Sequence, residues 1–249
     1  MSEEQNTKLA AAELRSPLLT KLDNFWYHYK WPFLGGLFTL IVLIVCLTQC
    51  AKNGKGDDGC YMYAGGYVLS VDERRNMESV LKTFAEDING DEKIVLAMMN
   101  FPIFTKEEIE REYDKGDQSH VAQMSYDNRE AFDQEILAGE AVLCFLSPSL
   151  FNDVAKAGGF VSVSAYADAL PEGVETVAYG DTAYGVLLSS LPISSYPGFS
   201  NLPKDTVVCL RTATSMSSLF GGDAAKLAYD AGYAMAIRMF GAEIYGHAE

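Results

Sequence analysis

Residues 127–160 read DNREAFDQEILAGEAVLCFLSPSLFNDVAKAGGF, and this stretch decides the fold class of the chain. Its first part has the apolar spacing of a helix, which Gly139 ends as a left-handed cap. Residues 141–146 (AVLCFL) are an uninterrupted apolar run of strand length, typical of a strand buried on both faces. Ser147 and Pro148 then have the N-cap and first-turn signature of a second helix. A buried strand between two helices predicts an α/β domain with a mainly parallel or mixed sheet.

The same alternation of strands and helices continues on both sides of this stretch. Two S/T-x-x-E capping boxes, Ser70/Glu73 and Thr105/Glu108, predict the beginnings of two further helices. Apolar runs predict strands at 61–68, 94–99, 184–189 and 206–210, and the spacing at 223–240 predicts a last helix. The pattern is weaker between residues 160 and 181, and residues 115–120 are predicted to be a loop.

Residues 31–47 (WPFLGGLFTLIVLIVCL) form the strongest feature before this domain. No charge occurs between Lys30 and Lys52, and the 21 residues between them are enough to cross a hydrocarbon core of about 30 Å as a helix. An aromatic cluster of the kind found at membrane interfaces precedes the run: Trp26, Tyr27, Tyr29 and Trp31. We expect an uncleaved, single-pass transmembrane helix over residues 31–50, with the lipid bilayer as its partner. The alternatives are a lipoprotein and a helix buried in a soluble core.

Basic residues on either side of the run give it an orientation. Arg15, Lys21 and Lys30 lie on the N-terminal side, against Lys52 and Lys55 on the other, which favours a cytoplasmic N-terminus. The expected organisation is a cytoplasmic segment at 1–30, a transmembrane helix at 31–50, a polar linker at 51–59 and an extracytoplasmic domain at 60–249.

Charge and composition exclude several classes of function. The formal charge of −15 lies entirely after residue 50, because residues 1–50 hold four basic and four acidic side chains. Such an acidic body would be repelled by phosphate backbones, so nucleic acid is excluded as a partner. With three histidines in the chain and no nucleophile–base or metal-ligand constellation, we expect no enzyme activity, no cofactor and no metal site. The run at Asp87–Asp91 lacks two essential positions of a calcium loop and is predicted to be a turn.

Residues 127–187 also resemble part of a known family, the bacterial extracellular solute-binding proteins of the type 2 periplasmic-binding fold. In that family a helix ends in a small-Gly-acidic turn, followed by an apolar strand, a helix and an Ala-Gly turn, here at 134–140, 141–146, 149–157 and 158–167. Tyr184-Gly185-Val186 resembles the step by which such chains return toward the hinge. The resemblance implies a domain that captures a small molecule for a transporter. Because the domain is acidic, we expect a sugar, a peptide or a cation as the ligand and not an anion. Family members have two lobes, whereas about 190 residues follow the linker here.

The ends of the predicted strands are the expected ligand site, because ligands of open α/β sheets bind outside the carboxyl ends of strands. Glycines at the end of the first strand permit close approach of a ligand, a nearby tyrosine can stack on it, and serines at a helix N-terminus can bind a hydroxyl group. The candidate ligand-binding residues are Gly65, Gly66, Tyr67, Ser147, Ser149 and Tyr184. The alternatives are a β-bulge with a packed tyrosine at 65–67 and helix capping by Ser147.

Two questions stay open at this level. The alternative function is a ligand-free interaction or scaffold module of the cell envelope with the same fold. Cys144 and Cys209 each fall in a predicted buried strand, and they either pair, if those strands are neighbours, or remain free thiols.

Overall fold

The structure is a computed structural model, which describes residues 17–53, 57–213 and 222–241 of the 249-residue chain. The chain divides into two compact units, residues 1–56 and residues 57–249. Most of the N-terminal segment predicted at 1–30, and part of the linker predicted at 51–59, lie outside the described residues.

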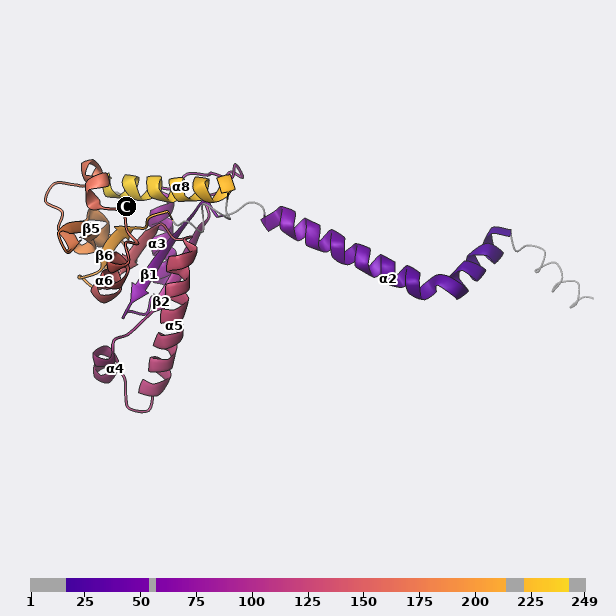
Figure 1. Ribbon diagram of the computed structural model, residues 1–249, viewed down its shortest axis with the longest axis horizontal. Coiled ribbons are helices and arrows are strands. Elements are labelled where there is room, and N and C mark those ends of the chain that lie inside the picture. The colour runs from indigo at the N-terminus through magenta and orange to yellow at the C-terminus, as the bar shows by residue number, and fades with distance from the viewer. Residues whose placement is uncertain (1–16, 54–56, 214–221, 242–249) are drawn as a thin grey trace, which may run out of the picture. The chain divides into compact units, whose positions relative to one another are not determined.

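The first unit contains one helix, α2 (Pro17–Asn53), with Pro32 inside it (Figure 1). Its side chains are described for residues 26–27 and 29–45 and are exposed there; Trp31, for example, is 76 % exposed and Phe38 is 69 % exposed. Within the described residues, no helix is both long enough and apolar enough to span a membrane. The side chains of residues 46–50, the last part of the predicted span, lie outside the described residues.

The second unit is built on one mixed sheet of six strands, in the order β2-β1-β3-β6-β5-β4. β1 is parallel to β2 and to β3, whereas β6 is antiparallel to both β3 and β5, and β4 is antiparallel to β5. The strands are β1 (Gly59–Gly65), β2 (Leu96–Pro102), β3 (Leu143–Leu146), β4 (Thr176–Tyr179), β5 (Thr182–Leu187) and β6 (Val207–Leu210). Because β1, β2 and β3 are parallel, their carboxyl ends meet at one edge of the sheet.

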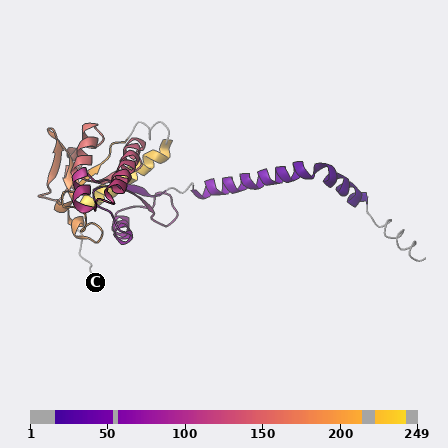
Figure 2. The ribbon, with the colours of Figure 1, turned by 90° about the horizontal axis from the view of Figure 1, so that it is seen from below.

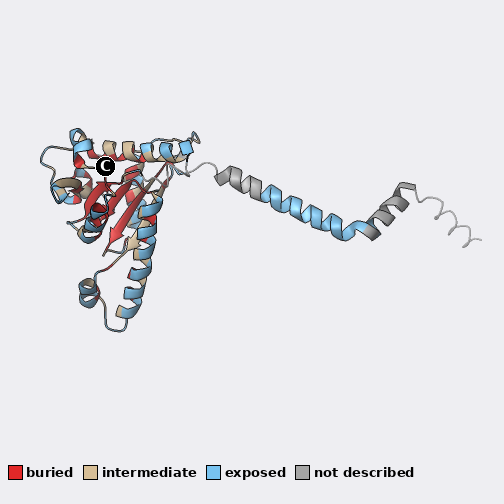
Figure 3. Cartoon of the chain, in the orientation of Figure 1, coloured by how far each residue is buried: buried red, intermediate tan, exposed pale blue. Residues whose placement is uncertain are grey.

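Helices cover both faces of this sheet, and its central strands β1, β3 and β6 are buried (Figures 1 and 3). The helices are α3 (Val71–Lys82), α4 (Lys106–Glu112), α5 (Gln118–Ala138), α6 (Pro148–Lys156) and α8 (Gly222–Gly241). Short 3₁₀ turns follow at Val163–Ala165, Ala167–Ala169, Leu188–Ser190 and Pro192–Ser195. Figure 2 shows the same layers from below.

Alternation along β1 divides the core into two parts. Tyr61 and Tyr63 face one side, where they share an apolar cluster with residues of α3 and α8. Met62 and Ala64 face the other side, where the cluster includes Phe132 of α5 and residues of α6. The domain is therefore a three-layer α/β structure, which confirms the predicted fold class at that level.

Apart from shifts of a few residues at the ends of strands, two elements differ from the prediction. α5 begins at Gln118, inside the predicted loop, because a small apolar cluster of Phe104, Ile109 and Val121 holds its first turns against α4. β4 falls in the region where the sequence pattern is weak, and its side chains are mostly exposed. An edge strand of this kind carries little apolar signal.

The turn predicted at Asp87–Asp91 is present, and hydrogen bonds to the Asp87 carboxylate stabilise it. The Asp87 carboxylate accepts hydrogen bonds from the backbone N–H groups of Gly90, Asp91 and Glu92 at 2.7–3.3 Å. Nearby, the buried carboxylate of Asp58 accepts from the N–H groups of Ile88 and Val95. These side chains close the loop between α3 and β2 onto the beginning of β1.

Candidate functional site

A pocket with a volume of about 510 Å³ lies where the parallel strands β1, β2 and β3 end. Two hydrogen bonds hold these strand ends together: the N–H of Ser147 donates to the carbonyl of Ala64, and that of Ile103 donates to the carbonyl of Gly65, both at 2.9 Å. The lining comes from the loops that follow the three strands, from α4, α5 and α6, and from the loop before β6. The lining residues are Tyr63, Gly66, Ile103, Phe104, Thr105, Glu108, Arg129, Ser147, Pro148, Ser149, Leu150, Pro203, Asp205 and Thr206.

Two serines lie at the beginning of α6 on one wall. The hydroxyl oxygens of Ser147 and Ser149 are 3.3 Å apart, within hydrogen-bond distance. Ser147 occupies the predicted N-cap position of α6, but its side chain makes no capping hydrogen bond. The side chain is instead paired with that of Ser149 at the pocket.

The carboxylate of Glu108, which also lines the pocket, lies beside Gly66. It belongs to a capping box, in which its Oε2 atom accepts a hydrogen bond of 2.6 Å from the N–H of Thr105. A Cβ atom on Gly66 would lie 2.7–2.8 Å from the carboxyl atoms of Glu108, closer than such contacts occur. Glycine at position 66 therefore makes room for this carboxylate, a more specific reason than the close approach of a ligand expected from the sequence.

Arg129 and Asp205 complete the charged lining. The guanidinium of Arg129 is paired with Asp133 at 3.1 Å and with Asp153 at 3.0 Å, both from outside the pocket. Asp205 is an exposed residue in the loop before β6. Burial raises the pKa of the Tyr63 hydroxyl, and the negative charges of Glu108 and Asp205 raise it further.

The six predicted site residues therefore do not form one group. Gly66, Ser147 and Ser149 line the pocket together. Gly65 is buried beneath it, where a Cβ atom would lie 3.0 Å from the Tyr63 hydroxyl. Tyr67 and Tyr184 do not line it.

The two tyrosines have other contacts. Tyr184 is in the middle of β5 and packs against the cluster on the α5–α6 side of the sheet. The hydroxyl of Tyr67 donates a 2.6 Å hydrogen bond to Glu73, the capping-box residue at the beginning of α3. Asn201 donates to the same oxygen at 2.8 Å. Tyr67 is thus part of a contact between α3 and the loop before β6.

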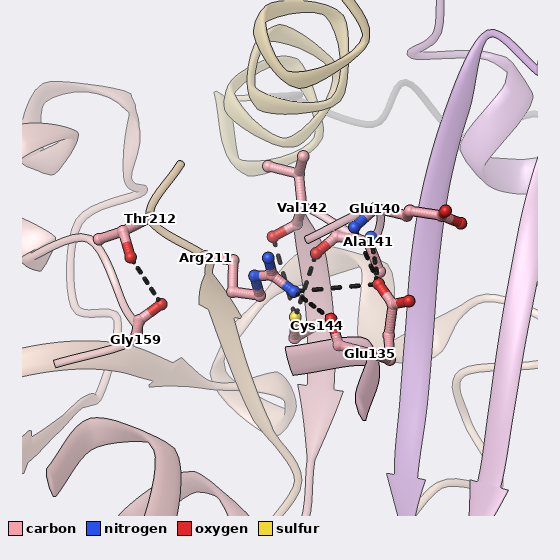
Figure 4. A network of polar contacts seen from close by, with 8 residues as sticks. All are labelled: Glu135, Glu140, Ala141, Val142, Cys144, Gly159, Arg211 and Thr212. Carbon is pink, nitrogen blue, oxygen red and sulfur yellow. Dashed lines mark hydrogen bonds and ion pairs between the residues drawn. The ribbon is translucent and has the colours of Figure 1, made fainter. Parts of the chain in front are cut away.

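A second polar network lies at the opposite edge of the sheet (Figure 4). Arg211, which is 1 % exposed, donates from Nη1 to the backbone carbonyl of Glu135 at 2.8 Å and lies 3.9 Å from its carboxylate. That carboxylate also accepts hydrogen bonds from the N–H groups of Glu140 and Ala141. Burial raises the pKa of Glu135, against the opposing effects of the Ala141 N–H and the Arg211 charge. The network joins α5, β3 and β6, and we assign it a structural role.

The cysteines lie on the same side of the sheet as this network. Cys144 and Cys209 are direct neighbours across β3 and β6, which is the arrangement that pairing requires, but both are free thiols. Cys60 is also free, and burial, with the negative charge of Glu135 as the next cause, raises the pKa of its thiol to about 12. A thiol with so high a pKa is a poor nucleophile at neutral pH.

Glu108, Asp205, Arg129 and Thr206 were not among the predicted site residues. The capping box at Thr105 and Glu108 is visible in the sequence, but it indicates only a helix start, not the direction in which the carboxylate faces. Asp205 and Thr206 come from a loop that reaches the pocket because β6 is inserted antiparallel beside β3. No local pattern encodes that placement.

No protein-family model matches the chain, and no curated protein or solved structure matches it at a significant level. The resemblance to solute-binding proteins therefore stays an expectation from residues 127–187.

Proposed function

We propose that the chain is a membrane-anchored, extracytoplasmic binding protein that captures a small polar molecule in the strand-end pocket and presents it to a transporter or another envelope protein. The observation that carries this proposal is the pocket itself, which gathers Gly66, Ser147 and Ser149 from loops distant in sequence. Its volume of about 510 Å³ falls in the range of about 300–1,000 Å³ usual for small-molecule sites.

The residue types at the pocket favour a polar ligand. Hydroxyl groups and carboxylates supply hydrogen-bond donors and acceptors, and Phe104 and Leu150 supply apolar surface. Two carboxylates on the wall and the charge of −15 on the chain disfavour an anion. A sugar, a peptide or a cation is therefore the expected class of ligand.

The anchor is proposed from the sequence. The uncharged run 31–50, the aromatic residues before it and the slight excess of basic residues on its N-terminal side support a single-pass helix with a cytoplasmic N-terminus. The apolar side chains of α2 that are described, such as those of Phe38 and Leu43, are exposed. Contact with lipid would cover them.

A variant that fills the pocket tests the proposed function. Ser149 is exposed and lines the pocket, so Ser149→Trp adds bulk there without disturbing the core. Asn152→Trp places the same side chain on an exposed position of the same helix that does not line the pocket. We expect a ligand found by screening sugars, peptides and cations against the full-length chain in detergent to bind the wild type and Asn152→Trp, and to lose binding in Ser149→Trp. Equal binding by both variants would contradict the proposal.

The alternative function, an interaction or scaffold module, has one observation in its favour. A second groove, of about 560 Å³, runs between α4 and α5 and includes Ile103, Phe104, Ile109 and Tyr126 in its lining. Apolar grooves between helices can receive a segment of another protein. A screen in which no compound binds, together with a stoichiometric protein partner that copurifies with the full-length chain, would favour this alternative.

A further inference from the structure

We propose that the strand-end pocket selects a cationic small molecule and that Glu108 binds its ammonium group. This inference rests on the proposed function and narrows its ligand class.

The position of Glu108 is fixed by contacts that leave one oxygen available. Oε2 accepts the hydrogen bond from Thr105, and the hydroxyl of Thr105 in turn accepts one from the N–H of Glu108 at 3.2 Å. Oε1 lies on the side of Gly66, and among the described residues no hydrogen bond or ion pair to it is found. A carboxylate that is held in place and still has a free oxygen is a ready acceptor for an ammonium group.

The charge balance of the pocket favours a cation. Glu108 and Asp205 line the pocket, and the negative charge of each raises the pKa of Tyr63. The positive charge of Arg129 is offset by Asp133 and Asp153. The lining residues therefore carry a net negative charge, and so does the domain as a whole. Both charges attract a cationic ligand.

The remaining groups suit an organic amine better than a metal ion. Among the described residues, no three histidine, cysteine or acidic side chains come close enough to hold a metal. A calcium ion takes about six to eight oxygen ligands, more than two carboxylates offer. The paired hydroxyls of Ser147 and Ser149 can bind a hydroxyl group of the ligand.

Matched pairs of compounds test this inference on the full-length chain in detergent. Each pair differs by one ammonium group: glucosamine and glucose, ethanolamine and ethylene glycol, and tyramine and tyrosol. We expect at least one amine to bind, measured by calorimetry, and its neutral counterpart to bind at least about tenfold more weakly. That factor is of the order of one charged hydrogen bond.

Substitutions then locate the ammonium group. We expect Glu108→Gln to weaken amine binding by about tenfold or more, and Asp205→Asn to weaken it by less. Glu107→Gln, one residue away on the exposed side of α4, should bind as the wild type does. Asp205→Asn leaves the capping box intact, so it tests the charge of the pocket even if Glu108→Gln unfolds α4.

The outcomes separate this inference from the proposed function. Neutral compounds could bind tightly, with binding that Ser149→Trp abolishes and Glu108→Gln leaves unchanged. This result would overturn the inference of a cationic ligand but would support the proposed binding function. Amine binding that is equal in wild type, Glu108→Gln and Asp205→Asn would also overturn it. If neither amines nor neutral compounds bind, the inference of a cationic ligand and the proposed function are both wrong.

Discussion

At the scale of single residues, Glu73 shows how one side chain takes more roles than its sequence motif indicates. The S-x-x-E pattern predicts its bond to the N–H of Ser70, and the structure confirms it at 2.7 Å. The further bonds from Tyr67 and Asn201 join it to residues 6 and 128 positions away. A local motif cannot reveal these partners, because the fold alone brings them together.

These bonds make stability dependent on pH. Burial works against the charged form of Glu73, but hydrogen bonds from Tyr67, Ser70 and Asn201 outweigh it and lower its pKa from 4.5 to about 2. A lowered pKa means that the contribution to stability is present above the unfolded value and is lost as pH falls through the folded one. We expect the difference in free energy of unfolding between wild type and Glu73→Gln to shrink as pH falls from 4.5 toward 2.

Urea unfolding of the full-length chain in detergent at several pH values measures this difference. Asp72→Asn is the matched control, because Asp72 is the neighbouring exposed carboxylate and forms a surface ion pair with Arg75. A difference that is constant over this pH range for Glu73→Gln would show that its bonds do not favour the ionised form.

At the scale of elements, the strength of the apolar pattern decided what could be predicted. β3 and the helix start at Ser147-Pro148 follow from the sequence, because a fully buried strand must be apolar throughout. The same holds for Gly139, whose φ of 94° confirms the predicted left-handed cap. β4 could not be predicted, because its side chains are mostly exposed and give little apolar pattern. The first turns of α5 could not be predicted either, because their packing against α4 depends on tertiary contacts.

The candidate site divides in the same way. The strand-end rule placed Gly66, Ser147 and Ser149 correctly at one pocket, since they directly follow parallel strands. It also placed Tyr67 at this pocket, but Tyr67 is hydrogen-bonded to Glu73 and does not line it. Asp205 could not be inferred, because its position depends on the insertion of β6 beside β3.

The contact between α5 and β6 offers a test at this scale. Arg211→Met removes the positive charge beside the buried carboxylate of Glu135. Because an unpaired buried charge is costly, we expect a loss of about 3–5 kcal/mol in the free energy of unfolding. In the Glu135→Gln background the same substitution should cost less, since no charge is then left unpaired.

A double-mutant cycle by urea unfolding gives this coupling. Lys82→Met is the control, because its pair with Glu78 is partly exposed and we expect it to cost no more than about 1 kcal/mol. Equal costs of Arg211→Met in both backgrounds would show that the two charges do not interact.

At the scale of the whole molecule, charge and apolar residues are separated along the chain. The net charge of −15 lies after residue 50, and the longest uncharged apolar run lies before that residue. A membrane anchor with a binding domain outside the cytoplasm would place each part in the solvent that suits it. The described lining residues of the pocket all belong to the second unit, residues 57–249.

The proposed topology makes the last prediction. A reporter that is active only outside the cytoplasm, fused after Glu249, should be active, and a reporter that requires the cytoplasm should be inactive there. Val42→Arg with Leu43→Arg places two charges in the middle of the uncharged run, at about 2.5–3.5 kcal/mol each for insertion at a helix centre. This variant should abolish external activity and release the chain from the membrane fraction. The same two substitutions at Lys52 and Lys55, which are already charged positions, should change neither result, and external activity that survives Val42→Arg with Leu43→Arg would mean that residues 31–50 do not anchor the chain.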